Sequence, residues 1–280
     1  MLRRPFKQVD VFSDQAFRGN PVAVVFDAEG LDDDQMRTIA RWTNLSETVF
    51  VLPPRSARAD YRLRIFTTLE ELAFAGHPTL GACHAWLERG GMPAGDDVIQ
   101  ECGIGLVQIR RTDHGLAFLS PPLLRNEQVD HGTTQTMLEV LGIGDAKVLG
   151  ARFLDNGIPW PALWLAHAED VLRAKPDYAR LHGAHIGLFA PWPADGGGVP
   201  EYEARTFIGG DAMPEDPVTG SFIAGVATWL TREGLAPGRF VVNQGRVIGR
   251  SGRVHATMDK DGLWIGGHAT TRVDGELRCA

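Results

Sequence analysis

Hydrophobic and polar positions along the chain follow two periods, one typical of strands and one typical of helices. In residues 61–68 ("YRLRIFTT") apolar side chains alternate with arginines, which predicts a half-exposed strand. In residues 31–44 Met36, Ile39 and Ala40 share one helical face behind an acidic first turn. The same patterns predict further strands at 6–12, 21–26, 45–54, 105–111, 115–122, 160–166, 201–209, 239–245, 254–259 and 262–269. Further helices are predicted at 78–89, 136–143, 168–183 (interrupted at Pro176) and 221–233.

Many strands with few long helices favour the α+β class over a doubly wound sheet. Residues 121–135 are rich in Pro, Asn, Asp, Gly and Thr, which is typical of a connection between domains. We therefore expect two lobes, an N-terminal lobe over 1–122 and a C-terminal lobe over 123–280.

Two distant stretches share one plan. When Trp86 is aligned with Trp229, "ACHAWLERGG" lies over "AGVATWLTREG", and upstream "RIF" lies near "RTF". A strand, a glycine-rich loop and a buried helix therefore occur twice, which indicates a duplication. We expect two pseudo-symmetric lobes with a ligand-binding cleft between them.

The start of each repeated helix suits a small anion. Backbone N–H groups at a helix N-terminus lack intrahelical partners, and the helix dipole is positive there. Gly76 in one copy and Gly220 in the other let the backbone approach a ligand, with Thr219 and Ser221 beside the second glycine. These residues are the candidate substrate-binding groups.

Three side chains are candidates for proton transfer. Glu47 stands in the apolar segment "NLSETVFV", where burial is expected to raise the pKa of its carboxyl group. His77 follows Gly76, and Asp216 precedes a proline. Each has a structural alternative: a strand-edge glutamate in water, a locally bonded histidine and a turn aspartate. Cys83, inside a helix, is expected to belong to the core.

Composition excludes several other functions. The net charge of −7 argues against broad nucleic-acid binding. Three scattered cysteines give no disulfide framework or zinc site, and the histidines, including those of "HGAH" (182–185), lack ligand spacing. This spacing argues against a metal site. No GxGxxG follows a strand, so a nicotinamide cofactor is not expected either. With no signal peptide or long apolar stretch, a cytoplasmic protein is predicted.

Several segments together resemble the PhzF-like family of phenazine-biosynthesis-type isomerases, which are relatives of diaminopimelate epimerase. The matching segments, in family order, are "VDVFSDQAFRGNPVAVV", "NLSETVFV", "FTTLEELAFAGHPTLGA", "EDPVTGSF" and "NQGRVIGR". The resemblance implies a diaminopimelate epimerase-like fold with two lobes, each a β-sheet rolled around a central helix. It also implies that the final strand, about 264–280, crosses back to the N-terminal lobe, and that the protein is a homodimer. Thr68 and Phe222 depart from the family pattern, and Phe222 is expected to narrow the cleft.

The resemblance implies that Glu47 is the proton-shuttling carboxylate and that Gly76, His77, Asp216 and Ser221 contact the substrate. We therefore expect a cofactor-independent isomerase of a small carboxylate-bearing molecule, without metal, nucleic-acid or membrane partners. Two alternatives stay open. One is an amino-acid epimerase with non-thiol bases, because neither helix start carries a cysteine. The other is a non-catalytic small-molecule binding protein.

Overall fold

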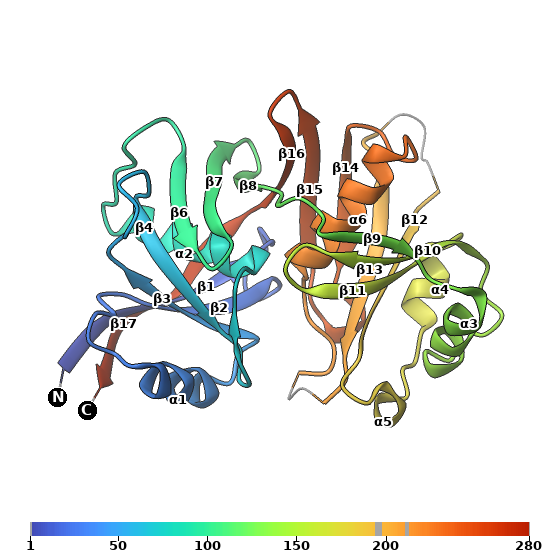
Figure 1. The fold of residues 1–280 in the computed structure, drawn as a ribbon, viewed down its shortest axis with the longest axis horizontal. Helices are drawn as coiled ribbons and strands as arrows, with labels where there is room; N and C mark the ends of the chain where they lie inside the picture. Colours follow the sequence, from blue (N-terminus) through green and yellow to red (C-terminus); the bar gives the residue numbers. More distant parts are fainter. Residues whose placement is uncertain (1, 194–197, 211–212, 280) are drawn as a thin grey trace. The chain divides into compact units, whose positions relative to one another are not determined.

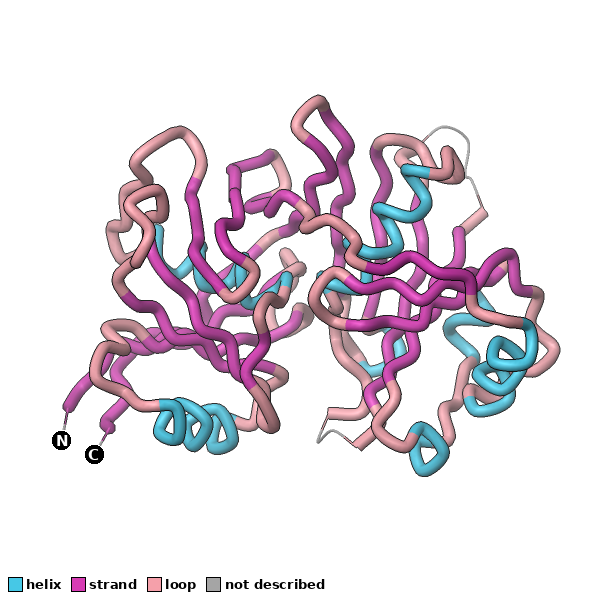
Figure 2. Tube along the Cα trace, viewed as in Figure 1, coloured by secondary structure: helices cyan, strands magenta, loops and turns pink. Residues whose placement is uncertain are grey.

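The computed structural model describes residues 2–193, 198–210 and 213–279. The chain forms two compact units: unit 1 consists of Met1–Leu119 with Gly266–Ala280, and unit 2 of Ser120–Ile265. Figure 2 shows that strands are the main regular structure of both units, with a few helices and many loops among them.

The elements follow the predicted alternation of strands and helices (Figure 1). Unit 1 contains β1 (Leu2–Val11), β2 (Asn20–Val25), α1 (Asp33–Thr43), β3 (Glu47–Leu52), β4 (Tyr61–Phe66), β5 (Glu71–Leu72), α2 (Gly76–Glu88), β6 (Val98–Cys102), β7 (Gly105–Thr112), β8 (Gly115–Leu119) and β17 (Ala269–Cys279). Unit 2 contains β9 (Arg125–Gln128), α3 (His131–Val140), β10 (Val148–Asp155), β11 (Pro159–Leu165), α4 (Ala168–Arg173), α5 (Tyr178–Leu181), β12 (His185–Pro191), β13 (Glu201–Ile208), α6 (Gly220–Arg232), β14 (Arg239–Gln244), a 3₁₀ turn (Arg246–Ile248) and β15 (Gly252–Asp259). Strand β16 (Gly262–Gly267) spans the boundary between the units.

The two units repeat one strand topology. In unit 1, β1 is antiparallel to β17 and β2, β2 is parallel to β3, β3 antiparallel to β4, β4 parallel to β6, and β6 antiparallel to β7. In unit 2, β10 is antiparallel to β9 and β11, β11 is parallel to β12, β12 antiparallel to β13, β13 parallel to β14, and β14 antiparallel to β15. The duplication predicted from the sequence is therefore confirmed at the level of topology.

Each unit is built around one apolar helix. Helix α2 contacts β1, β2, β3, β4, β6, β8 and β17, and helix α6 contacts β10, β11 and β15. Small residues allow this close packing: a Cβ atom on Gly81 would lie 2.4 Å from Cγ1 of Val22. Both helices are buried over most of their length, as expected of central helices.

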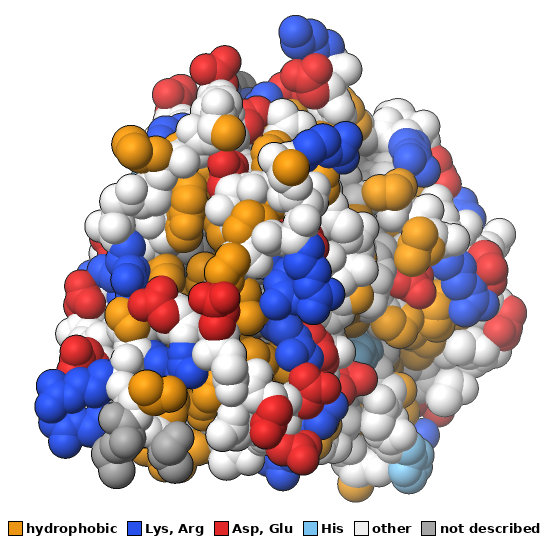
Figure 3. Space-filling model, turned by 60° about the vertical axis from the view of Figure 1, so that its left-hand side comes forward, with side chains coloured by type: hydrophobic (Ala, Val, Ile, Leu, Met, Phe, Trp, Pro, Cys, Tyr) orange, Lys and Arg blue, Asp and Glu red, His pale blue; other side chains and the backbone are white. Residues whose placement is uncertain are grey.

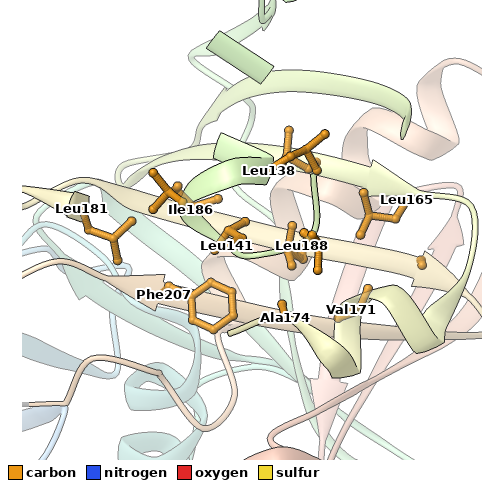
Figure 4. Close-up of a cluster of buried hydrophobic side chains, with 13 residues drawn as sticks. Leu138, Leu141, Leu165, Val171, Ala174, Leu181, Ile186, Leu188 and Phe207 are labelled. Carbon is orange, nitrogen blue, oxygen red and sulfur yellow. The ribbon is translucent and has the colours of Figure 1, made fainter. Parts of the chain in front are cut away.

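Outer helices close secondary cores in both units. In unit 1, Met36 and Ala40 of the amphipathic helix α1 pack on Phe50 and Phe66, which confirms the predicted apolar face. In unit 2, a larger cluster joins α3, α4 and α5 to β11, β12 and β13 and includes Leu188 and Phe207 (Figure 4). The alternating pattern of residues 61–68 places Phe66 on the exposed face of its strand. In the structure Phe66 is buried, because α1 covers that end of β4.

Some elements differ from the prediction. Residues 121–135, predicted to be a connection, contain β9 and the start of α3, where Asp130 caps the helix through the backbone N–H of Thr133. Strand β9 is exposed and polar, so it shows no alternation and is held by backbone pairing with β10. Strands β6, β10 and β12 are further elements that the patterns did not predict. The break at Pro176 is confirmed, since α4 and α5 are separate helices.

Charged side chains of both signs are interspersed with apolar ones over the face of the molecule in Figure 3. Within the described ranges, no helix has the length and apolar character needed to cross a bilayer.

Candidate active site

Unit 1 brings Glu47 and His77 into contact. Glu47 is the first residue of β3 and its side chain is 12% exposed, while His77 is the second residue of α2 and is buried. Oε2 of Glu47 lies 3.2 Å from Nε2 of His77. That nitrogen makes no hydrogen bond to any of the described residues, because the contact with Glu47 falls outside hydrogen-bonding geometry.

Asn20 fixes the protonation of the imidazole. Its amide nitrogen lies 3.2 Å from Nδ1 of His77, and its amide oxygen accepts the hydroxyl of Ser46 at 3.5 Å. Because an amide nitrogen can only donate, Nδ1 acts as the acceptor and the ring proton sits on Nε2, the atom nearest Glu47. Asn20 is completely buried at the start of β2, so its amide is held in place.

Burial lowers the pKa of His77 to about 3, so the imidazole is neutral near pH 7. The neutral form agrees with the hydrogen bond from Asn20, which requires an unprotonated Nδ1. An ionised Glu47 would therefore face a neutral imidazole and not a positively charged one. The expected rise in the pKa of Glu47 stays a prediction.

Helix α2 begins without a side-chain cap. Its N-cap residue is Ala75, which has no polar side chain, and Gly76 is the first helical residue. Gly76 and His77 are both buried. The first-turn N–H groups therefore have no capping side chain, as an anion-accepting helix start requires.

Unit 2 holds Asp216 and Thr219 in one buried network. The hydroxyl of Thr219 donates to Oδ2 of Asp216 at 2.5 Å, and the backbone N–H of Asp216 donates to the carbonyl of Thr206 at 3.2 Å. Thr219 occupies the N-cap position of α6 without capping it, and its hydroxyl oxygen instead accepts the amide of Gln244. The start of α6 thus has the same uncapped form as the start of α2.

Gln244 organises this loop from strand β14. Its amide nitrogen donates to the hydroxyl of Thr206, the hydroxyl of Thr219 and the carbonyl of Asp216, each at 3.0 Å. Its amide oxygen accepts the backbone N–H of Thr219, also at 3.0 Å. Gln244 is buried, so these bonds fix the loop that carries Asp216.

Ser221 is buried at the second position of α6. Its hydroxyl oxygen accepts the indole N–H of Trp160 at 3.3 Å, and its carbonyl accepts the amide of Asn156 at 2.8 Å. The neighbouring Phe222 points into the unit 2 core, where a Cβ on Gly187 would lie only 2.1 Å from the Phe222 ring. The large ring is thus accommodated by a glycine inside unit 2.

An Arg–Glu pair precedes both loops. In unit 1 Arg64 binds Glu71 through two bonds of 2.7 and 2.6 Å, and in unit 2 Arg205 binds Glu215 through two bonds of 2.8 Å. Each glutamate stands five residues before the first glycine of its helix (76 − 71 and 220 − 215). The arginines occupy the same position of a shared Tyr-x-x-Arg-x-Phe strand, at 61–66 and 202–207.

Sequence reasoning named Glu47, His77, Gly76, Asp216, Thr219, Gly220 and Ser221, and the structure groups the first three in unit 1 and the other four in unit 2. It did not name Asn20, Gln244 or Trp160. Asn20 in "GNP" and Gln244 in "NQG" stand beside glycines at strand ends, and this is the sequence feature that could have identified them.

Cys83 lies in the core, where burial raises the pKa of its thiol to about 12. Over the described part of the chain, no three His, Cys, Asp or Glu side chains cluster as a metal site would need.

A two-lobed α+β fold of this kind is found in known structures. A predicted epimerase from Pseudomonas aeruginosa superposes with a TM-score of 0.81 at 30% identity, covering 99% of this chain and 100% of that one. The hydroxyproline epimerase of Agrobacterium vitis shares the fold, with a TM-score of 0.63 at 13% identity over 98% of this chain and 92% of its own. The architecture is therefore the diaminopimelate epimerase-like fold.

The sequence comparisons identify the family. The family model for phenazine biosynthesis-like proteins, PhzC-PhzF, matches residues 9–275. Antisense-enhancing sequence 1 of Schizosaccharomyces pombe is 34% identical over 99% of both chains. Trans-2,3-dihydro-3-hydroxyanthranilate isomerase of Pseudomonas chlororaphis is 32% identical, over 81% of this chain and 79% of its own. This chain belongs to the PhzC-PhzF family, the PhzF-like isomerases.

Proposed function

We propose that the protein is a cofactor-independent isomerase of a small carboxylate-bearing molecule, with Glu47 as the group that moves the proton. The observation that carries the proposal is the 3.2 Å contact between Glu47 and the buried His77 at the start of α2. A carboxylate held in a largely buried position beside a neutral imidazole is suited to take a proton from carbon and to return it.

The proposed reaction is a proton shift. Glu47 takes the proton of a C–H bond, the electron pair of that bond delocalises into the adjacent unsaturated system, and the carboxylic acid so formed returns the proton to another carbon. His77, with its proton on Nε2, orients the carboxylate and the substrate. The uncapped start of α2, at Gly76, stabilises the charge that develops. No oxidant or co-reactant is required.

In unit 2 we propose that Asp216 takes part in proton relay and that Thr219, Gly220 and Ser221 bind the substrate. The support is the buried network around Asp216 and Gln244, which holds these groups in fixed positions before any ligand arrives. The name of the Pseudomonas chlororaphis relative suggests a cyclic amino carboxylate as the substrate class.

The homodimer and the cytoplasmic location are further proposals. The dimer rests on the family resemblance and the location on three scattered, free cysteines. Sedimentation of the pure protein tests the dimer, and a monomer at tens of micromolar, roughly the range used for stable dimers, would contradict it.

The test of the function is proton exchange. Cyclic and amino carboxylates that raise the melting temperature are incubated with the protein in D₂O, and deuterium at substrate carbon is measured by mass spectrometry. Glu47→Gln should lower exchange by about 10²- to 10⁴-fold while the melting temperature and ligand affinity stay close to those of the wild type.

The exposed Glu70→Gln variant is the matched control and should exchange normally. An active, normally folded Glu47→Gln protein would refute the assigned role. Deuterium at one stereocentre with inversion would favour the epimerase alternative. A wild type that binds carboxylates without any exchange would favour a binding protein.

A further inference from the structure

The repeated topology allows positions in unit 2 to be compared with those of the candidate site in unit 1. In unit 1, Thr48 of β3 pairs with Phe66 of β4, and in unit 2, Ile186 of β12 pairs with Phe207 of β13. The two phenylalanines end the shared Tyr-x-x-Arg-x-Phe strand, so Thr48 and Ile186 are equivalent.

The residues before them are therefore equivalent as well: Glu47 in unit 1 and His185 in unit 2. Each is the first residue of its strand. The position that carries the proposed base in one unit thus carries an imidazole in the other.

The neighbouring parallel strands show what lies beside each of these two positions. Val22 pairs with Glu47, an offset of 47 − 22 = 25, and Ala162 pairs with Gly187, an offset of 187 − 162 = 25. The same offset places Trp160 beside His185, and their rings are in contact with centroids 5.0 Å apart.

Trp160 also links His185 to the start of α6. Its indole N–H donates to the hydroxyl oxygen of Ser221, and Ser221 is the second residue of α6 as His77 is the second residue of α2. In unit 1 the first side chain of the strand, Glu47, touches the second side chain of the central helix, His77. In unit 2 the corresponding residues, His185 and Ser221, each contact the buried indole of Trp160.

We propose that His185 is a substrate-recognition residue of unit 2, which binds a carboxylate group of the ligand together with the Ser221 hydroxyl. The proposal rests on the function proposed above and names a specificity residue for it. Glu47 can only accept hydrogen bonds when ionised, whereas the imidazole and the hydroxyl are donors, which suit an anionic oxygen. His185 is half-buried, and its ring lies against Trp160.

The experiment separates recognition from packing. His185→Phe keeps a ring on Trp160 but removes the donor, and His185→Gln restores a donor without the ring. His131→Gln, an exposed histidine of unit 2, is the control. Binding of anthranilate and benzoate, two stable planar carboxylates, is measured by calorimetry, and exchange kinetics are measured on whichever carboxylate the wild type turns over.

His185→Phe should weaken binding of both probes and raise KM by about 10- to 100-fold, with kcat changed much less, as expected for loss of a hydrogen bond to a charged group. His185→Gln should recover part of the loss, and the control should behave as the wild type. A packing role would give the opposite order, with Phe tolerated and Gln impaired.

Normal probe affinity in a normally folded His185→Phe protein would overturn the proposal, as would a wild type that binds neither probe. If His185→Phe has a lowered melting temperature, probe affinity is compared between His185→Gln and His185→Ala instead. Retention of more affinity by Gln than by His185→Ala supports recognition, and equal loss in the two contradicts it. Probe binding that depends on His185 without any proton exchange would refute the isomerase function and leave the recognition role standing.

Discussion

Units 1 and 2 place the same Arg–Glu pair in very different surroundings. Arg64 and Glu71 have side chains that are 20% and 36% exposed, and Arg64 also binds Asp33 of α1. Arg205 and Glu215 are only 3% and 7% exposed, and the remaining donors of Arg205 reach the carbonyls of Val171, Leu172 and Ala174. The same ion pair thus stands before the central helix in both units, but it is buried only in unit 2.

The residues proposed for catalysis and binding differ more between the two units than the strand topology does. The second residue of the central helix is His77 in unit 1, where Glu47 contacts it, and Ser221 in unit 2. The two units therefore share the strand topology and the ion pair, while the side chains at the proposed substrate-binding positions differ. The comparison can be tested through stability and pH, because the equivalent groups differ in burial and charge.

The largest effect is expected from the buried pair. Glu215→Gln leaves the Arg205 guanidinium buried without its counter-charge, and we expect a loss of about 3–5 kcal/mol in the free energy of unfolding. Urea unfolding at pH 7 measures it. A change below about 1 kcal/mol, the range of exposed pairs, would show that burial does not distinguish the two units.

His77 should make unfolding sensitive to acid. Its folded pKa of about 3 lies below the unfolded value of 6.5, so the unfolded chain binds the extra proton first. Stability from this group is complete above pH 6.5 and falls toward pH 3, by at most about 1.4 kcal/mol per pH unit. The difference between wild type and His77→Gln across that range isolates the effect, and parallel pH curves would contradict it.

Glu203 should act in the opposite direction. It occupies the position that Arg62 holds in unit 1, and burial raises the pKa of its carboxyl group from 4.5 to about 7. Because the folded form keeps its proton longer, its contribution is complete below pH 4.5 and is lost as pH rises through 7. Thermal melting of Glu203→Gln should show a smaller decline over that interval than the wild type. An unchanged decline would remove Glu203 as the cause.

The smallest effect is expected from the exposed pair. Glu71→Gln should cost about 0–1 kcal/mol in the same urea experiment, because water screens the Arg64 charge and Asp33 stays bound to it. Equal losses in Glu71→Gln and Glu215→Gln would break the comparison between the units.

Much of this arrangement could be predicted from the sequence. The repeated Trp-Leu pattern identified both central helices, although the predicted starts at residues 78 and 221 fall shortly after the observed first residues, Gly76 and Gly220. The alignment on tryptophan is nevertheless one residue out within the helices, since Trp86 stands 10 residues after Gly76 and Trp229 stands 9 after Gly220. The loop from Phe to the first glycine spans 76 − 66 = 10 residues in unit 1 and 220 − 207 = 13 in unit 2, so the spacing from Phe to Trp still differs, at 20 and 22 residues.

Other features could not be predicted, for physical reasons. Strand β12 is apolar throughout its buried part, and such a run has no period that separates a strand from a helix. The bond from Asn20 to His77 joins residues 57 positions apart, so it depends on how β2 and α2 pack. The equivalence of Glu47 and His185 is invisible in composition, because it rests on strand register and the two residues share no chemistry.

The pairing of β17 with β1 has a consequence for the order of folding. Leu2 lies opposite Cys279 and the two strands pair along nearly their whole length (Figure 1). During synthesis β1 emerges first and β17 last, so one flank of β1 stays unpaired while all of unit 2 is being made. Unit 2 is continuous in sequence and can complete its sheet earlier. The unit that carries Glu47, the proposed base, is therefore completed only after residues 269–279 have been made.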